Sequence, residues 1–280
     1  MSKLDLDHVG IAVRNLDAAA VHFERLGFQL TPRGYHTLPA GPDGRRARVG
    51  TGNNCAMLQH GYIELIGITD PHYSGRLRSD LARYEGVHIV AFGTEDSETT
   101  LRSLRQSGMS ADVRVLERPI EYRGNTELAR FEIIEFADAL PELYAFAIHH
   151  VTPEALWKPE LIEHPNGAKS LEGITVVVSD PGSFARRLRR VVGEADNSEA
   201  PLIDLRRGTV RVVGDAWVRM RYEGPPLPLP AVVGITIGTE NLSRTADALQ
   251  ARGVSIEREQ EKLIVAPAFA SGAMIEFVPV

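Results

Sequence analysis

The chain has 280 residues, of which 43% are hydrophobic and 24% charged, and its formal net charge is −6. Acidic and basic residues are interspersed, which argues against a nucleic-acid or anionic-membrane surface and favours a small-molecule partner. The single cysteine, Cys55, excludes an internal disulfide framework. No signal-peptide pattern precedes Leu4, and no apolar run approaches the ~18 residues of a membrane span. We therefore expect a soluble cytoplasmic protein.

The first predicted elements are a strand, "LDHVGIAV" (6–13), and a helix, "AAAVHFERLGF" (18–28). Two further apolar segments follow as strands at 45–59 and 61–68. On the first strand Val9, Ile11 and Val13 alternate and predict one buried face. The opposite face carries His8 followed by small residues, Gly10 and Ala12, which we interpret as open space beside an imidazole.

The same pattern of strand, polar turn, helix and glycine returns near residues 87, 173 and 233. Each helix precedes strand-like segments, at 128–136 and 143–150, at 202–213 and 217–224, and at 262–269 and 273–280. The sequence therefore predicts an α+β protein of four βαβββ units. One such unit cannot bury its sheet, so the units should form two pairs. We expect one domain at 1–151, a linker at 152–170 and a second, degenerate pair at 171–280.

Ionisable residues on predicted strands concentrate in the first pair. His8 and Glu64 lie on the first and last strands of unit one, and a carboxylate in so apolar a strand must be paired or bound to a metal. In unit two, His88 takes roughly the place of His8, and His150 shares a face with Phe146 at the end of the last strand. Imidazole and carboxylate groups suit iron, manganese, zinc or nickel. The alternative is that each histidine is a satisfied core residue and the glutamate an ion-pair partner.

The motifs "DHVGIAVRNLDAAAVHFERLGF", "LTPRGYH", "GTGNNCAML" and "GYIELIGI", followed by "HHVTPEALWKPELIEHPNGA", resemble the glyoxalase-like branch of the vicinal oxygen chelate superfamily, over residues 4–170. In residues 171–280 the resemblance retains a terminal-strand glutamate, Glu276. The resemblance implies paired βαβββ units that curl into open barrels, with a divalent metal on the inner face.

The resemblance also implies site residues. His8 and Glu64 match metal-ligand positions, and His88 falls within one residue of a third. At the fourth position Phe146 replaces the usual glutamate, so we predict His150 as a ligand or catalytic base, with His88 as the other candidate. Asn54 stands where the branch often shows histidine, which leaves a polar role in the substrate pocket to His36 or Asn53.

Two main functions follow. The first is a metal-dependent lyase, isomerase or ring-cleaving dioxygenase acting on a small substrate with neighbouring oxygens. The second is a metal-free protein that binds or sequesters a small molecule in the same cavity. A third hypothesis makes residues 171–280 an interaction module. Exposed strand edges favour a homodimer.

Overall fold

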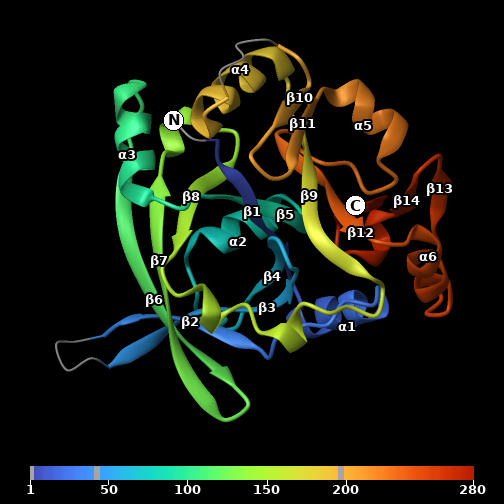
Figure 1. Ribbon diagram of the computed structural model, residues 1–280, viewed down its shortest axis with the longest axis horizontal. Helices are drawn as coiled ribbons and strands as arrows, with labels where there is room; N and C mark the ends of the chain where they lie inside the picture. The colour runs from blue at the N-terminus through green and yellow to red at the C-terminus, as the bar shows by residue number, and fades with distance from the viewer. Residues whose placement is uncertain (1–2, 41–44, 195–198) are drawn as a thin grey trace.

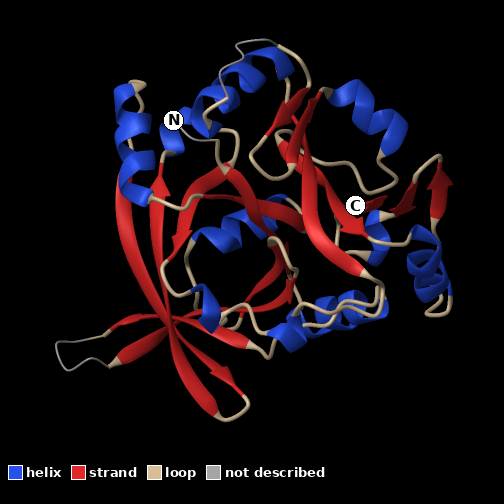
Figure 2. Ribbon diagram, viewed as in Figure 1, coloured by secondary structure: helices blue, strands red, loops and turns tan. Residues whose placement is uncertain are grey.

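The computed structural model describes residues 3–40, 45–194 and 199–280. In these ranges the strands form one large mixed sheet, with the helices mostly around its periphery (Figure 2). No helix of the described part combines the length and hydrophobicity needed to cross a membrane. The α+β class predicted from the sequence is confirmed.

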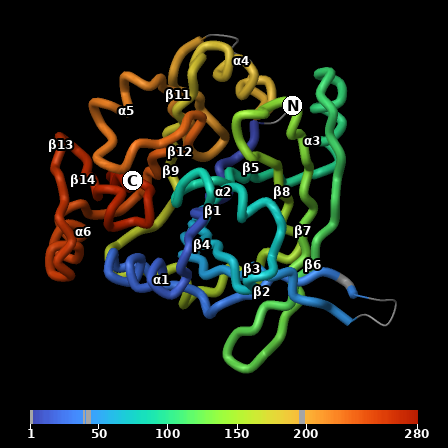
Figure 3. Tube along the Cα trace, turned by 180° about the vertical axis from the view of Figure 1, so that it is seen from behind, coloured from blue at the N-terminus to red at the C-terminus, as the bar shows by residue number. Residues whose placement is uncertain are grey.

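The first half of the sheet is built around β1 (Asp5–Val13), which pairs in parallel with β4 (Tyr62–Ile68) and antiparallel with β5 (Gly86–Gly93). Beyond β4 lie β3 and β2, and beyond β5 lie β8, β7 and β6. Their bounds are Arg46–Met57 for β3, Gly34–Pro39 for β2, Tyr144–His150 for β8, Asn125–Glu135 for β7 and Asp112–Tyr122 for β6. The sheet curls until its outer strands β2 and β6 meet, as both views show, and Arg46 donates a hydrogen bond to the Glu117 carbonyl there (Figures 1 and 3). This curled half is the first barrel.

Helices cover the convex side of the first barrel. Helix α1 (Leu16–Arg25) begins at Asn15, whose side chain accepts hydrogen bonds from two backbone N–H groups, and it buries Phe23. Helix α3 (Ser97–Gln106) begins in the same way at Asp96. Helix α2 (Arg76–Arg83) instead lies within the ring of strands, where Leu77 and Leu81 pack against Ala12 and Ile66 (Figure 1).

The second half begins with β9 (Ala168–Val177), after two short 3-10 turns at Pro153–Ala155 and Pro159–Leu161. β9 pairs antiparallel with β12 (Ala231–Thr239), and one residue pair, Val87 with Val232, joins this half to β5. The remaining strands are β10 (Leu202–Asp204), β11 (Thr209–Val213), β13 (Glu257–Glu259), β14 (Lys262–Val265) and β15 (Met274–Pro279). The helices are α4 (Pro181–Val192), α5 (Asp215–Arg221) and α6 (Leu242–Gln250). The domain boundaries at 151 and 171 stay a prediction.

The prediction of a last strand of unit three at residues 217–224 is wrong, because helix α5 covers most of this segment. As a strand it would place Val218, Met220 and Tyr222 on one face, but Met220 is 74% exposed. The helix instead packs Trp217 and Val218 against an apolar cluster that includes Val233. Asp215 and Arg219, four residues apart, add an ion pair that a strand could not form.

The open space expected beside His8 is also wrong. A β-carbon added to Gly10 would lie 2.8 Å from the Cβ and Cδ1 atoms of Ile89, on the neighbouring strand. Ala12 is covered by helix α2. The small residues of β1 are therefore required by close packing inside the barrel, not by an open cavity.

Substituting Gly10→Ala should lower the free energy of unfolding by about 1–3 kcal/mol, the usual cost of overpacking a rigid core. The nearest atom is a β-carbon, which no side-chain rotation can move away. Urea denaturation measures the loss. Unchanged stability would mean that this side of β1 faces open space after all.

Candidate functional site on the inner face of the first barrel

Strand register places His8 and Glu64 on one face. On the parallel pair β1–β4, His8 is opposite Tyr62 and Gly10 is opposite Glu64. Because side chains alternate along a strand, all four positions face the interior of the barrel. His8 and Glu64 are 5% and 8% exposed. The predicted pair is therefore buried on the concave surface.

Glu64 is held in a polar cluster from β2 and β3. Asn53 donates a hydrogen bond to its Oε1, and the His36 Nε2 lies 3.5 Å from the same oxygen. The other His36 nitrogen, Nδ1, is 2.9 Å from the Thr51 hydroxyl. Burial would raise the pKa of Glu64, but the hydrogen bond and charge of His36, followed by the charges of His8 and Arg118, outweigh it and lower that pKa to about 2. Glu64 is therefore an ionised acceptor at neutral pH.

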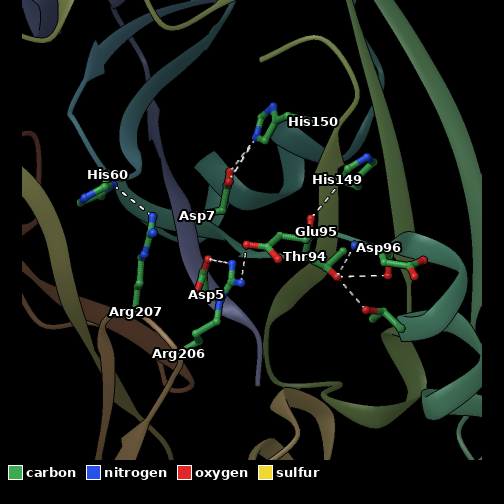
Figure 4. A network of polar contacts seen from close by, with 11 residues as sticks. Asp5, Asp7, His60, Thr94, Glu95, Asp96, His149, His150, Arg206 and Arg207 are labelled. Atoms are coloured by element: carbon green, nitrogen blue, oxygen red, sulfur yellow. Dashed lines mark hydrogen bonds and ion pairs between the residues drawn. The ribbon is translucent and has the colours of Figure 1, made fainter. Parts of the chain in front are cut away.

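Asp7 forms a second cluster that the sequence did not predict. Its Oδ1 lies 2.6 Å from His8 Nδ1. Both its oxygens lie 3.1 Å from His150 Nε2 (Figure 4). A register shift between Leu6 and His8 leaves Asp7 as an extra residue on β1, which turns its carboxylate toward the histidines. Burial alone would raise the pKa of Asp7. His150, and then His8, outweigh it through their charges and hydrogen bonds, and they hold the pKa of Asp7 well below the usual range.

The Asp7 carboxylate fixes which imidazole nitrogens carry hydrogen. Since a carboxylate accepts only, it favours the proton on Nδ1 of His8 and on Nε2 of His150. This leaves Nδ1 of His150 as the other nitrogen, and it is buried without a hydrogen-bond partner in the described structure. An imidazole oriented by a carboxylate, with its second nitrogen available, is the arrangement of a general base.

Tyr62 packs against both imidazoles of the Asp7 cluster. Its ring stacks on His8 at 4.3 Å between centroids and meets the edge of His150 at 6.4 Å. Burial, followed by the charges of Asp7 and Glu64, raises the pKa of Tyr62 well above its ordinary value, so its phenol stays protonated. Phe146 also meets His8 in an edge contact, with ring centroids 5.9 Å apart.

His88 lies away from this site. Its Nε2 is 3.0 Å from the Tyr84 carbonyl, its ring stacks on Tyr84 at 4.0 Å, and Nδ1 is 3.9 Å from an Asp80 oxygen on α2. The register explains this position. Val9 of β1 is paired with Val90 of β5, and equivalent positions are counted along each strand from this pair. Two residues before it, each strand carries one extra residue, Asp7 on β1 and His88 on β5. His88 is thus the counterpart of Asp7, and the counterpart of His8 is Ile89.

The residues present do not fit a metal held by three protein side chains. On β4, Glu64 pairs with Gly10 of β1. The matching position on β8 is Phe146, which pairs with Ala91 of β5. Two of the four positions thus carry Ile89 and Phe146, which have no donor atom. In residues 3–40, 45–194 and 199–280 no group of three His, Cys, Asp or Glu side chains is arranged to hold a metal ion. His150 reaches His8 through Asp7 and not through Glu64.

A cavity of about 260 Å³ adjoins the Glu64 cluster. Asn53, Cys55 and Met57 of β3 line one side, and Arg118, Ile120 and Tyr122 of β6 line another. Burial and the charge of Glu64 raise the pKa of the Cys55 thiol to about 12, which keeps it neutral.

Asn54, the next residue along β3, has a structural role. Its Nδ2 donates to the Thr31 carbonyl at 2.9 Å, and its Oδ1 accepts from Arg33 at 2.7 Å. Of the two asparagines, Asn53 is therefore the one that contacts the candidate site.

Acid should destabilise the protein through Glu64. Because its folded pKa lies below that of the unfolded chain, its stabilising contribution is present above pH 4.5 and is lost as the pH falls toward 2. The shift corresponds to roughly 3 kcal/mol. Urea unfolding at pH 6 and pH 3 should show a smaller difference for Glu64→Gln than for the natural chain, whereas the exposed control Glu121→Gln should leave the difference unchanged. Parallel pH profiles for all three proteins would contradict the assignment.

Comparison with known proteins agrees with this fold. A search of curated protein sequences found no significant match. A hypothetical protein from Staphylococcus aureus is similar in structure, with a TM-score of 0.64 and 12% identity over 99% of this chain and 100% of that one. A variant of 4-hydroxymandelate synthase from Streptomyces coelicolor has a TM-score of 0.59 and 13% identity, over 100% and 93% of the two chains.

A fusion of a xylose isomerase-like TIM barrel with 4-hydroxyphenylpyruvate dioxygenase has a TM-score of 0.61 and 11% identity, over 99% of this chain and 49% of the fusion. Such low identities show the fold and nothing finer. The family model described as a glyoxalase-like domain matches residues 6–192, more than half of the sequence. The chain therefore belongs to the glyoxalase-like domain family and has the vicinal oxygen chelate fold.

Proposed function

We propose that this protein binds a small organic molecule in the first barrel without a metal held by three of its side chains. The observation that carries the proposal is the unequal inner face. One wall has the Glu64 and Asp7 clusters, while the two matching positions on the other wall are Ile89 and Phe146. A cavity with apolar walls and a few polar groups is typical of small-molecule sites.

The polar groups have distinct capacities in this proposal. Glu64 is ionised and only accepts hydrogen bonds, so a ligand group that meets it must donate. His150 is the candidate for proton exchange, because Asp7 orients it and its Nδ1 has no partner in the described structure. His88 takes no part, since Tyr84 and Asp80 surround it.

The second candidate is the metal-dependent enzyme predicted from the resemblance. The superfamily and its dioxygenase neighbours suggest a divalent metal, and two structural neighbours are named for hydroxymandelate and hydroxyphenylpyruvate chemistry. The close approach of His36 to Glu64 favours it, because imidazole and carboxylate are metal ligands. We place it second because the third and fourth ligand positions are apolar.

The homodimer stays a prediction that light scattering tests.

Metal analysis separates the two candidates. Protein purified without chelator should contain far less than one equivalent of iron, manganese, zinc or nickel, and His8→Ala should not change that content. One bound equivalent that is lost in both His8→Ala and Glu64→Gln would overturn the metal-free proposal in favour of the enzyme.

A fragment screen by NMR tests the cavity directly. Ala155, which is 2% exposed, lines the cavity, so Ala155→Leu should fill part of it and weaken fragment binding at least about ten-fold. Leu156→Ala, at the neighbouring lining position, should retain or extend the set of fragments that bind. Equal binding by the natural chain and Ala155→Leu, with both folded, would show that this cavity is not the site.

A further inference from the structure

Arg118 is an unpaired cation in the wall of the first-barrel cavity. It lies on β6 opposite Ala129 of β7, and its Nε is buried without a hydrogen-bond partner. Within the described residues its guanidinium makes no hydrogen bond or ion pair. It does contact the ring of Phe131, with Cζ 5.5 Å from the ring centroid. A buried donor without an acceptor is costly, so Arg118 needs a partner that the chain does not supply.

The other cations around the cavity are already engaged. Arg33 donates to Asn54 and Asp17. Arg48 lies over the Tyr35 ring, with its Cζ 3.8 Å from the centroid.

Lys158 contacts both oxygens of Glu127, at 2.7 and 2.8 Å. Arg48, like Arg118, contacts a ring and no carboxylate or carbonyl in the described structure, but Arg48 is exposed to solvent, whereas the Nε of Arg118 is buried without a partner.

Glu64 does not serve as that partner. The charge of Arg118 contributes to the low pKa of Glu64, so the two groups interact through the interior. However, the Glu64 Oε1 is bound by Asn53 and approached by His36, and the structure forms no ion pair between Glu64 and Arg118. The guanidinium, which carries only donors, is left facing the cavity.

We propose that Arg118 binds the anionic group of the ligand, and that the ligand is a small organic carboxylate with a compact apolar body. The inference rests on the proposed function and adds the ligand's chemical class. Met57, Ile120 and Leu156 supply apolar walls, and a volume of about 260 Å³ limits the body to roughly one ring. Glu64, behind Asn53, repels a second negative charge, so a monoanion with its carboxylate on the Arg118 side fits best.

The test compares three acids with their neutral amides: benzoate with benzamide, phenylacetate with phenylacetamide, and cyclohexanecarboxylate with its carboxamide. NMR titration of the full chain at pH 7 should show each carboxylate binding at least about ten-fold more tightly than its amide, since hydrogen bonds to a charged group are the stronger ones. Arg118→Gln should remove that preference and Arg118→Lys should retain part of it. The matched control is Arg123→Gln, at the tip of the same hairpin, where Arg123 is 67% exposed and paired with Glu160.

Stability gives a second readout. Arg118→Gln removes a half-buried charge that has no ion pair in the described structure, but it also removes the favourable effect of that charge on Glu64, so the unfolding midpoint should stay close to that of the natural chain. A marked drop would mean that Arg118 has a structural partner and would overturn the inference. The inference also fails, while the proposed function stands, if amides bind as tightly as carboxylates or if Arg118→Gln keeps the preference. If no acid or amide binds, both fail together.

Discussion

The antiparallel pairing of β1 with β5 determines which side chains reach the inner face of the first barrel. The two strands pair about Val9 and Val90, and each carries one extra residue, Asp7 on β1 and His88 on β5. The first irregularity turns Asp7 toward two imidazoles, and the second turns His88 toward helix α2. A difference of one residue in register thus separates a position in the site from a position in the packing of α2.

Charge neutralisation inside the barrel follows from that register. Two carboxylates of the inner face, Asp7 and Glu64, are each matched by imidazoles, which outweigh the rise in pKa that burial alone would cause. The second half of the sheet resolves the same problem differently. Glu276 on β15 is bound by Lys262 and lies near the Thr236 hydroxyl, while α5 packs its apolar side chains on that half. A glutamate at a similar place in the repeat is therefore part of an internal ion pair there.

Much of the fold could be predicted because it depends on periodic patterns. Strand alternation correctly placed His8 and Glu64 on one face, and the repeated strand–helix pattern gave the α+β class. Neither Asp7 nor the displacement of His88 could be predicted, since a bulge is a local change of register that leaves the hydrophobic pattern intact. Helix α5 was missed because its residues alternate like a strand, and only the packing of Trp217 shows which period applies. Arg118 gave no signal, because its lack of a partner is a property of the folded interior.

The distribution of polar groups also constrains any chemistry at this site. His150 takes part in the first barrel through Asp7, and it also lines a larger cavity of about 870 Å³, which reaches the second half at Arg206 and Arg207 (Figure 4). Around that cavity Arg206 is paired with Asp5 and Glu95, and Arg207 with His60, so its cations are satisfied within the chain. The unsatisfied cation, Arg118, borders the smaller cavity beside Asn53. A ligand anchored by Arg118 would therefore lie in the smaller cavity, whereas His150 contacts Asp7 and lines the larger one.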